Sequence, residues 1–259
     1  MFIMNTLITH KKDGIGWIQF HRPAVRNAVN QEMMAELEHV ITEWEQDETL
    51  QVVVLYGDEK AFVSGGDVEA FHQIHTKEEI YPVMKRMGDL LQRISELKCI
   101  TIAAVEGIAV GGGCEVVTSC DFCLASKKAK FGMIQSRIAI TTGWGGASRL
   151  MNKIGKPNAL KMLITGEVID VERAKEMQLV DEVIESSHFL EEVQVFAQQF
   201  VLPSPMIGRA YKEVALALEQ GTPLSAFAKI EATNCADCWE AEEHVQAVER
   251  FLAKRNKVD

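Results

Sequence analysis

The sequence predicts an α/β protein whose last segment is entirely helical. Two apolar segments rich in β-branched residues, Gln51–Gly57 and Cys99–Val105, are typical of strands covered on both faces of a parallel sheet. Segments in which apolar residues recur at helical spacing lie between them and after them. Past Val201, Pro203-Ser204-Pro205 interrupts the chain, and only helical patterns follow. We therefore expect a mixed core over residues 1–201 and a helical region over 202–259.

The first predicted elements are a hairpin and a helix. Thr6–Lys11 and Ile15–Phe20 flank Asp13-Gly14, a frequent hairpin turn, and the second segment alternates as a half-buried strand does. Asn30 is expected to cap the N-terminus of the helix that follows. The apolar residues of that helix recur at helical spacing: Met33, Met34, Leu37, Val40, Ile41 and Trp44.

Later helices are predicted from similar signals. Ile80–Leu97 has a helical pattern with Pro82 near its start. Leu150–Thr165 predicts a single helix that ends at Gly166. Asp170 is expected to cap the N-terminus of another helix.

The charge and hydropathy of the chain exclude several classes of function. With 27 basic and 37 acidic residues the net charge is −10, so no chain-wide positive field would attract nucleic acid or an anionic membrane. No apolar run has the length of a membrane span, and no basic stretch precedes the short apolar run at the N-terminus. We therefore expect a cytoplasmic protein that binds neither nucleic acid nor membrane.

The six cysteines include two C-x-x-C pairs, Cys120/Cys123 and Cys235/Cys238, a spacing that zinc sites use. The two pairs lie far apart in the sequence. Cys120 and Cys123 adjoin the apolar segment Phe122–Ala125, where small thiols are ordinary core residues. We expect reduced cysteines and no metal site.

A glycine-rich segment is a candidate ligand site. GIAVGGGCE (Gly107–Glu115) follows the second buried strand and matches neither common phosphate-loop spacing. A helix that begins near Gly112 would direct free N–H groups and its positive dipole at a ligand, which suits a developing oxyanion. Glu115 would then lie about one turn along. A tight crossing of helix and strand, with Glu115 paired to an arginine, explains the same pattern equally well.

A second segment favours the ligand interpretation. KAFVSGGD (Lys60–Asp67) also follows a buried strand, and it places Gly65 and Gly66 before Asp67, which is expected to start a helix. Two such loops at the ends of strands could each direct one N–H group at the same point.

Three motifs, in this order and at these intervals, resemble the crotonase or enoyl-CoA hydratase/isomerase superfamily: FVSGGD, GIAVGGGCE and FGMIQSRIAITTGWGGASRL (Phe131–Leu150). HRPAVRNAVN and LITGEVIDVERAKEMQLVDEVI are similar to flanking motifs, so the resemblance extends over essentially the whole chain. It implies a spiral of β-β-α turns over 1–201 that binds an acyl-CoA thioester. It also implies a C-terminal helical region over 202–259 that assembles homotrimers or homohexamers. Coenzyme A is part of the substrate, and no further cofactor is implied.

The resemblance also implies the active-site residues. The backbone N–H groups of Gly66 and Gly112 would form an oxyanion hole, and Glu115 would be the general acid/base. Gln135 occupies the position of the second catalytic glutamate of the hydratases. Hydration needs one group to activate water and one to deliver a proton, whereas Gln135 can orient a water but cannot take its proton. No Asp or Glu occurs from Phe122 to Gly166 to replace it.

This departure leaves several functions open. Arg137 would either reach the acyl pocket, where it could bind a substrate carboxylate, or contact a neighbouring subunit. WGGASRL is similar to the ethylmalonyl-CoA decarboxylase-like branch, and Trp144 is either part of such a pocket or a core aromatic. The candidates are an acyl-CoA lyase or isomerase, a decarboxylase of methylmalonyl- or ethylmalonyl-CoA, and a non-catalytic acyl-CoA-binding member. We expect an enzyme of the broad hydratase/isomerase type.

Contacts with the CoA moiety are implied as well. They involve Ser64, Gly66, Asp67, Arg26, Phe251 and Lys254. A surface helix with an apolar stripe is the other interpretation of Phe251 and Lys254.

Overall fold

The computed structural model describes residues 3–185 and 187–255, and the larger of its sheets has six strands. Their order is β1 (Leu7–Lys12), β2 (Ile15–Phe20), β3 (Val52–Tyr56), β5 (Ile100–Val105), β7 (Phe122–Ser126) and β10 (Glu182–Ile184). The β1–β2 pair is antiparallel and the other pairs are parallel. The hairpin turn predicted at Asp13-Gly14 is confirmed, because the two residues have φ values of 52° and 77°.

A smaller sheet lies beside the larger one and consists of short strands that sequence patterns did not predict. They are β4 (Ala61–Val63), β6 (Ile108–Val110), β8 (Lys130–Gly132) and β9 (Val168–Asp170), in this order. β4, β6 and β8 are parallel, and each follows a strand of the larger sheet, namely β3, β5 and β7. The chain therefore repeats a long strand, a short strand and a helix. This repeat is the expected spiral of β-β-α turns.

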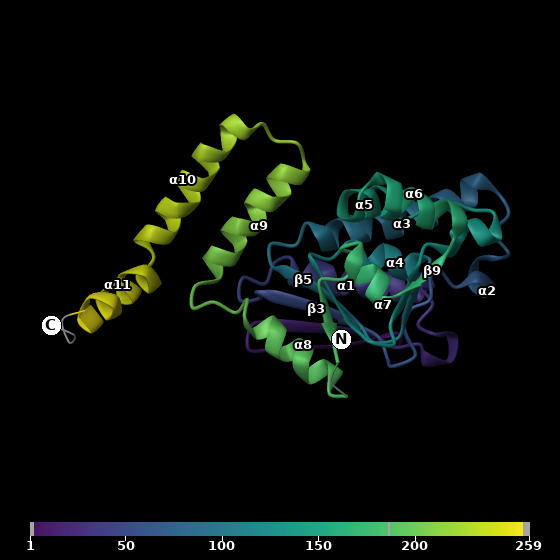
Figure 1. Ribbon diagram of the computed structural model, residues 1–259, viewed down its shortest axis with the longest axis horizontal. Coiled ribbons are helices and arrows are strands. Elements are labelled where there is room, and N and C mark those ends of the chain that lie inside the picture. Colours follow the sequence, from purple (N-terminus) through teal and green to yellow (C-terminus); the bar gives the residue numbers. More distant parts are fainter. Residues whose placement is uncertain (1–2, 186, 256–259) are drawn as a thin grey trace.

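Helices cover both faces of the larger sheet (Figure 1). α1 (Gln31–Trp44) and α3 (Lys77–Ser95) share an apolar cluster with Leu55 of β3. α8 (Phe189–Gln198) covers the opposite face, over Val54. Both faces of β3 are therefore buried, which explains its unbroken apolar sequence.

Local signals at helix ends are confirmed. The Asn30 side chain accepts a hydrogen bond from the Met33 N–H at 2.9 Å and caps α1. Asp170 caps α7 (Val171–Glu176) in the same way. Gly166, with φ of 63°, ends the helix before it in a left-handed conformation.

Two helix predictions need correction. α3 begins at Lys77, with Thr76 as its cap, so Pro82 lies inside the helix rather than near its start. The single helix predicted over residues 150–165 is wrong. The chain forms α5 (Gly146–Ile154) and α6 (Lys156–Thr165), because Gly155, with φ of 76°, breaks the helix between them. Besides α7, the short helices among the described residues are α2 (Val68–Phe71), α4 (Gly112–Val117) and the 3₁₀ turns Pro23–Val25 and Ile134–Ile138.

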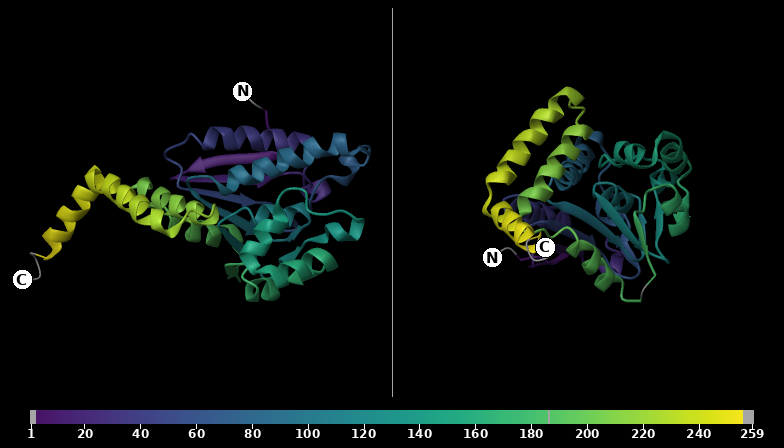
Figure 2. Two further views of the ribbon diagram at one scale, coloured as in Figure 1. Left: turned by 90° about the horizontal axis from the view of Figure 1, so that it is seen from above. Right: turned by 60° about the vertical axis from the view of Figure 1, so that its left-hand side comes forward.

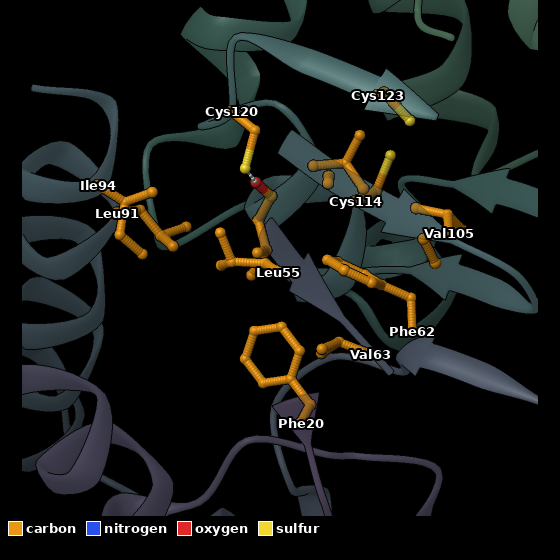
Figure 3. Close-up of a cluster of buried hydrophobic side chains, with 14 of the residues drawn as sticks. Phe20, Leu55, Phe62, Val63, Leu91, Ile94, Val105, Cys114, Cys120 and Cys123 are labelled. Carbon is orange, nitrogen blue, oxygen red and sulfur yellow. Dashed lines mark hydrogen bonds between the residues drawn. The ribbon is translucent and has the colours of Figure 1, made fainter. Parts of the chain in front are cut away.

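The core between the sheets is apolar and contains the cysteine pair Cys120/Cys123 (Figure 3). Burial raises the pKa of the Cys120 thiol to about 12 and that of Cys123 well above its ordinary value, so both are unreactive core residues. Cys235 and Cys238 lie far from them, on a C-terminal helix. In the described part of the chain, no cluster of His, Cys, Asp and Glu could hold a metal ion.

The chain ends in three helices that extend away from the sheets (Figures 1 and 2): α9 (Pro205–Glu219), α10 (Leu224–Glu240) and α11 (Glu242–Arg255). Lys212 of α9 is buried and forms an ion pair with Asp121 at the start of β7, which attaches α9 to the core. Within residues 3–185 and 187–255, no helix has both the length and the apolar character that crossing a membrane requires.

Candidate active site

Two glycine loops meet at one edge of the smaller sheet. β4 and β6 are parallel neighbours, so the loops that follow them, with Gly65-Gly66 and Gly111-Gly112, lie at the same edge. A methyl group placed on Gly65 would lie only 3.3 Å from the Gly112 nitrogen, so the loops are in contact. Among the described residues, neither the Gly66 N–H nor the Gly112 N–H has a hydrogen-bond acceptor. The edge therefore presents two free backbone donors close together.

Each residue of the glycine triplet has its own reason to be glycine. Gly111 has φ of 56° and ψ of −122°, a conformation that only glycine adopts easily. A side chain on Gly112 would overlap the ring of Trp144. A side chain on Gly113 would overlap the carbonyl of Val63. The tight crossing therefore explains Gly113, whereas Gly112 is required by the Trp144 ring.

Glu115 lies in the first turn of α4, and its carboxylate is held by three N–H donors. Its Oε1 accepts a hydrogen bond from Gln135 Nε2 at 2.9 Å. Its Oε2 accepts from the backbone N–H groups of Trp144 and Gly146, both at 2.9 Å. A side chain on Gly146 would overlap Glu115, so the WGG sequence permits this close approach.

Burial raises the pKa of the Glu115 carboxyl above its ordinary value. The hydrogen bonds from Gly146, Trp144 and Gln135, and then the charge of Arg149, act in the opposite direction. A buried carboxyl with a raised pKa suits a group that both takes up and releases a proton.

Arg149 of α5 holds the loop that binds Glu115. Its Nη2 donates to the carbonyl of Trp144, and its Nε is buried without a partner among the described residues. Burial lowers the pKa of Arg149. Arg149 therefore forms no ion pair with Glu115 and acts on it through its charge and through the Trp144 main chain.

Gln135, on the 3₁₀ turn Ile134–Ile138, faces the Glu115 carboxylate. Its amide nitrogen donates a hydrogen bond to Glu115. Its Oε1 is buried and has no donor among the described residues. Gln135 therefore retains one unused acceptor beside the Glu115 carboxylate.

Two aromatic rings border the free donors. The Trp144 side chain is only 3% exposed, and its six-membered ring packs on Gly112. A methyl group on Gly66 would lie 3.6 Å from Trp144 Cζ2 and 3.5 Å from Phe71 Cε2. Trp144 and Phe71 thus reach the same point beside Gly66.

The residues implied for the CoA moiety fall into two groups. Arg26 and Ser64 lie together, because the Ser64 N–H donates to the Arg26 carbonyl at 3.1 Å. Asp67 caps α2 and forms an ion pair with Arg22 at 2.8 Å, so its carboxylate already has partners. These residues surround the Gly65-Gly66 loop.

The remaining predicted residues lie elsewhere in this single chain. Phe251 and Lys254 are exposed on α11, at the far end of the molecule from α2 (Figure 1). Arg137 is exposed, and its side chain packs along Gly166. The proposed contacts of these three side chains with substrate therefore remain predictions.

Sequence reasoning missed three functional candidates. Gly146 and Arg149 hold Glu115 and its loop, and Phe71 borders Gly66. The WGG motif signals a close backbone approach, but only the folded chain shows that Glu115 is the group approached.

The fold and the paired loops define a protein of the crotonase fold. The enoyl-CoA hydratase from Bacillus anthracis has a TM-score of 0.89 and 25% identity, over 96% of this chain and 97% of that one. An enoyl-CoA hydratase from Geobacillus kaustophilus has a TM-score of 0.90 and 25% identity, over 98% of this chain and 96% of that one.

Sequence comparison places the chain within one family. The enoyl-CoA hydratase/isomerase model matches residues 10–258, so the chain belongs to this family. The short-chain-enoyl-CoA hydratase of Clostridium acetobutylicum is 30% identical, over 97% of this chain and 96% of that protein. The ethylmalonyl-CoA decarboxylase of Bos taurus is 34% identical, over 78% of this chain and 67% of that protein. The chain is therefore similar both to hydratases and to ethylmalonyl-CoA decarboxylases. The chemistry of the site must distinguish between these two reactions.

Proposed function

We propose that the protein is an acyl-CoA lyase or isomerase that moves a proton at the α carbon of a CoA thioester through an enolate. The observation that carries this proposal is the position of Glu115. Its buried carboxylate, held by three N–H donors, lies one helical turn from the free N–H of Gly112. Coenzyme A enters as part of the substrate, and the proposal needs no other cofactor.

The two free N–H groups would form the oxyanion hole. The thioester oxygen accepts hydrogen bonds from Gly66 and Gly112, and both bonds strengthen as the enolate develops its negative charge. The donors are fixed by the register of β4 and β6, so they need no reorganisation during the reaction. Loss of one such donor typically costs about a hundredfold or more in rate.

Glu115 would exchange a proton with the α carbon. Its Oε2 is used by two backbone donors, whereas its Oε1 accepts only from Gln135, so Oε1 has capacity for the proton. With one carboxylate the site handles one proton at a time. Hydration in this site would require Gln135 Oε1 to orient the water while Glu115 serves as both base and acid.

Decarboxylation of a malonyl-type CoA ester is the second candidate, and the neutral Gln135 and the buried Trp144 favour it. Loss of CO₂ generates the enolate without a base, and protonation at the α carbon then needs only one acid. Trp144 would keep water from the leaving carboxylate. The 34% identity with the bovine ethylmalonyl-CoA decarboxylase supports this alternative.

The protein is further proposed to be cytoplasmic and to act as a homotrimer or homohexamer. Large apolar side chains are exposed on the C-terminal helices, which suits assembly with further copies. They include Tyr211, Leu224, Trp239 and Phe251.

The decisive experiment is a mass-spectrometric screen of the purified protein with crotonyl-, 3-hydroxyacyl-, methylmalonyl- and ethylmalonyl-CoA, together with α-proton exchange of butyryl-CoA in D₂O. Gln135→Glu separates the two reactions. In a hydratase it restores a carboxylate pair and raises hydration of crotonyl-CoA about 10- to 1,000-fold. In a decarboxylase the added negative charge repels the substrate carboxylate, so CO₂ release slows. Absence of every one of these reactions, including exchange, would refute the proposal.

A further inference from the structure

We infer that Trp144, together with Phe71, restricts the site to short acyl groups by filling the space that a longer acyl chain would need. The inference rests on the proposed function, because it takes the paired glycine loops as the place of the thioester carbonyl. It adds the size of the acyl group, which neither the loops nor Glu115 determine.

Trp144 extends from the acid/base to both glycine loops. Its backbone N–H donates to Glu115 Oε2 at 2.9 Å. Its ring packs so closely on Gly112 that no side chain fits there, and its Cζ2 comes within 3.6 Å of a methyl position on Gly66. One residue therefore borders the proposed acid/base and both proposed oxyanion donors.

These contacts define where an acyl chain can run. The thioester oxygen lies at Gly66 and Gly112, and the α carbon must lie within reach of Glu115. The chain beyond the α carbon then leaves from between the hole and the carboxylate. The Trp144 ring stands at this exit, so a long straight chain would have to displace it.

The ring is fixed in place by its own main chain. The Trp144 N–H is bonded to Glu115, its carbonyl accepts from Arg149, and its Cα packs on Gly88 of α3, where a methyl group would lie 3.7 Å away. The side chain is 3% exposed. Moving the ring would therefore disturb the carboxylate that the reaction uses. Phe71 is half-buried on the four-residue helix α2, and it forms the more adaptable wall.

The test measures affinity for saturated acyl-CoA esters by calorimetry, so that it does not depend on which reaction the enzyme catalyses. Each methylene that enters an apolar chamber typically improves affinity about fourfold. For the wild type we expect octanoyl-CoA to bind no more tightly than butyryl-CoA, because the added methylenes find no chamber. For Trp144→Ala we expect octanoyl-CoA to bind at least about tenfold more tightly than butyryl-CoA.

Two further variants separate this effect from a general loss of packing. Phe71→Ala removes a half-buried ring at the same point, so it should fold well and shift the octanoyl-to-butyryl ratio in the same direction by a smaller factor. Trp44→Ala removes another buried indole, on α1, and should leave the ratio at its wild-type value. If Trp144→Ala does not fold, Phe71→Ala still decides the question.

The outcomes are distinct. A wild type whose affinity rises with every methylene from butyryl to octanoyl would overturn the inference and leave the proposed function intact. The same holds if neither Trp144→Ala nor Phe71→Ala changes the ratio. If butyryl-CoA does not bind the wild type at all, the proposed function itself fails.

Discussion

Replacing Glu115 by glutamine should abolish turnover without weakening the fold. Glutamine has the size of glutamate, so its carbonyl oxygen can accept the two hydrogen bonds from Trp144 and Gly146. Its amide nitrogen would face Gln135, whose unpaired Oε1 can turn to accept from it. Both backbone donors would then keep an acceptor, and Gln135 would still have one unpaired polar atom, its amide nitrogen in place of its oxygen. Only the capacity to carry a proton is lost.

The stability of this variant follows from the raised pKa of Glu115. The folded state holds the Glu115 proton more tightly than the unfolded state, so the carboxyl favours folding at low pH. This contribution is lost as the pH rises from the ordinary value of 4.5 through the folded pKa. Above that pH the buried charge opposes folding. Glu115→Gln removes the charge, so at neutral pH its free energy of unfolding should equal or exceed that of the wild type.

Glu115→Ala is the matched control. It strands three N–H donors, at roughly 1–3 kcal/mol each, and leaves a cavity as well. We therefore expect Glu115→Ala to lose about 3 kcal/mol or more in chemical denaturation, whereas Glu115→Gln loses none.

Activity is measured by α-proton exchange of butyryl-CoA and by turnover of any substrate that the screen identifies. We expect the rate of Glu115→Gln to fall about a hundredfold or more, with butyryl-CoA affinity nearly unchanged. Turnover within about tenfold of the wild type would show that Glu115 is not the acid/base. A loss of stability similar to that of Glu115→Ala would refute the hydrogen-bond account.

Three other predictions concern charge and assembly. The rate of α-proton exchange should increase with rising pH as Glu115 ionises. Arg149→Gln should move the midpoint of this pH profile to higher pH, because the Arg149 charge lowers the pKa of Glu115. An unchanged midpoint would contradict this. Lys212→Met removes the ion pair with Asp121 and should lower the free energy of unfolding by roughly 1–3 kcal/mol. This is less than the loss of a fully buried pair costs, because Asp121 is partly exposed. A change within about 0.5 kcal/mol in denaturant titrations would count against it. Sedimentation should give a trimer or hexamer, and a single 28.9 kDa species at micromolar concentration would contradict assembly.

The sequence predicted those parts of the fold that depend on local chemistry. Asn30, Asp170 and Gly166 act on residues within one turn, so their positions sufficed to locate helix ends. Strands of three residues, such as β4 and β6, are too short to show a period, and the smaller sheet was missed for that reason.

The candidate site was predictable only in part. The two glycine loops stand out in the sequence because they follow buried strands. The groups that hold Glu115 do not stand out, because Gln135, Trp144 and Gly146 lie 20 to 31 positions away and meet it only in the folded chain. Gly146 reaches it through the packing of α5 on α4. α5 ends at Gly155, which divides the predicted single helix in two.

The parallel register of β4 and β6 also determines when the two glycine loops come together during folding. Parallel neighbours cannot pair through a hairpin, and here α2, α3 and β5 must form the crossover between them. The two free donors therefore come together only after long loops have closed, a slow step compared with helix formation. The Trp144 and Gly146 N–H groups, which bind the Glu115 carboxylate, are synthesised later still. We conclude that a nascent chain can already contain α1 and the β1–β2 hairpin while the groups of its candidate active site are still apart.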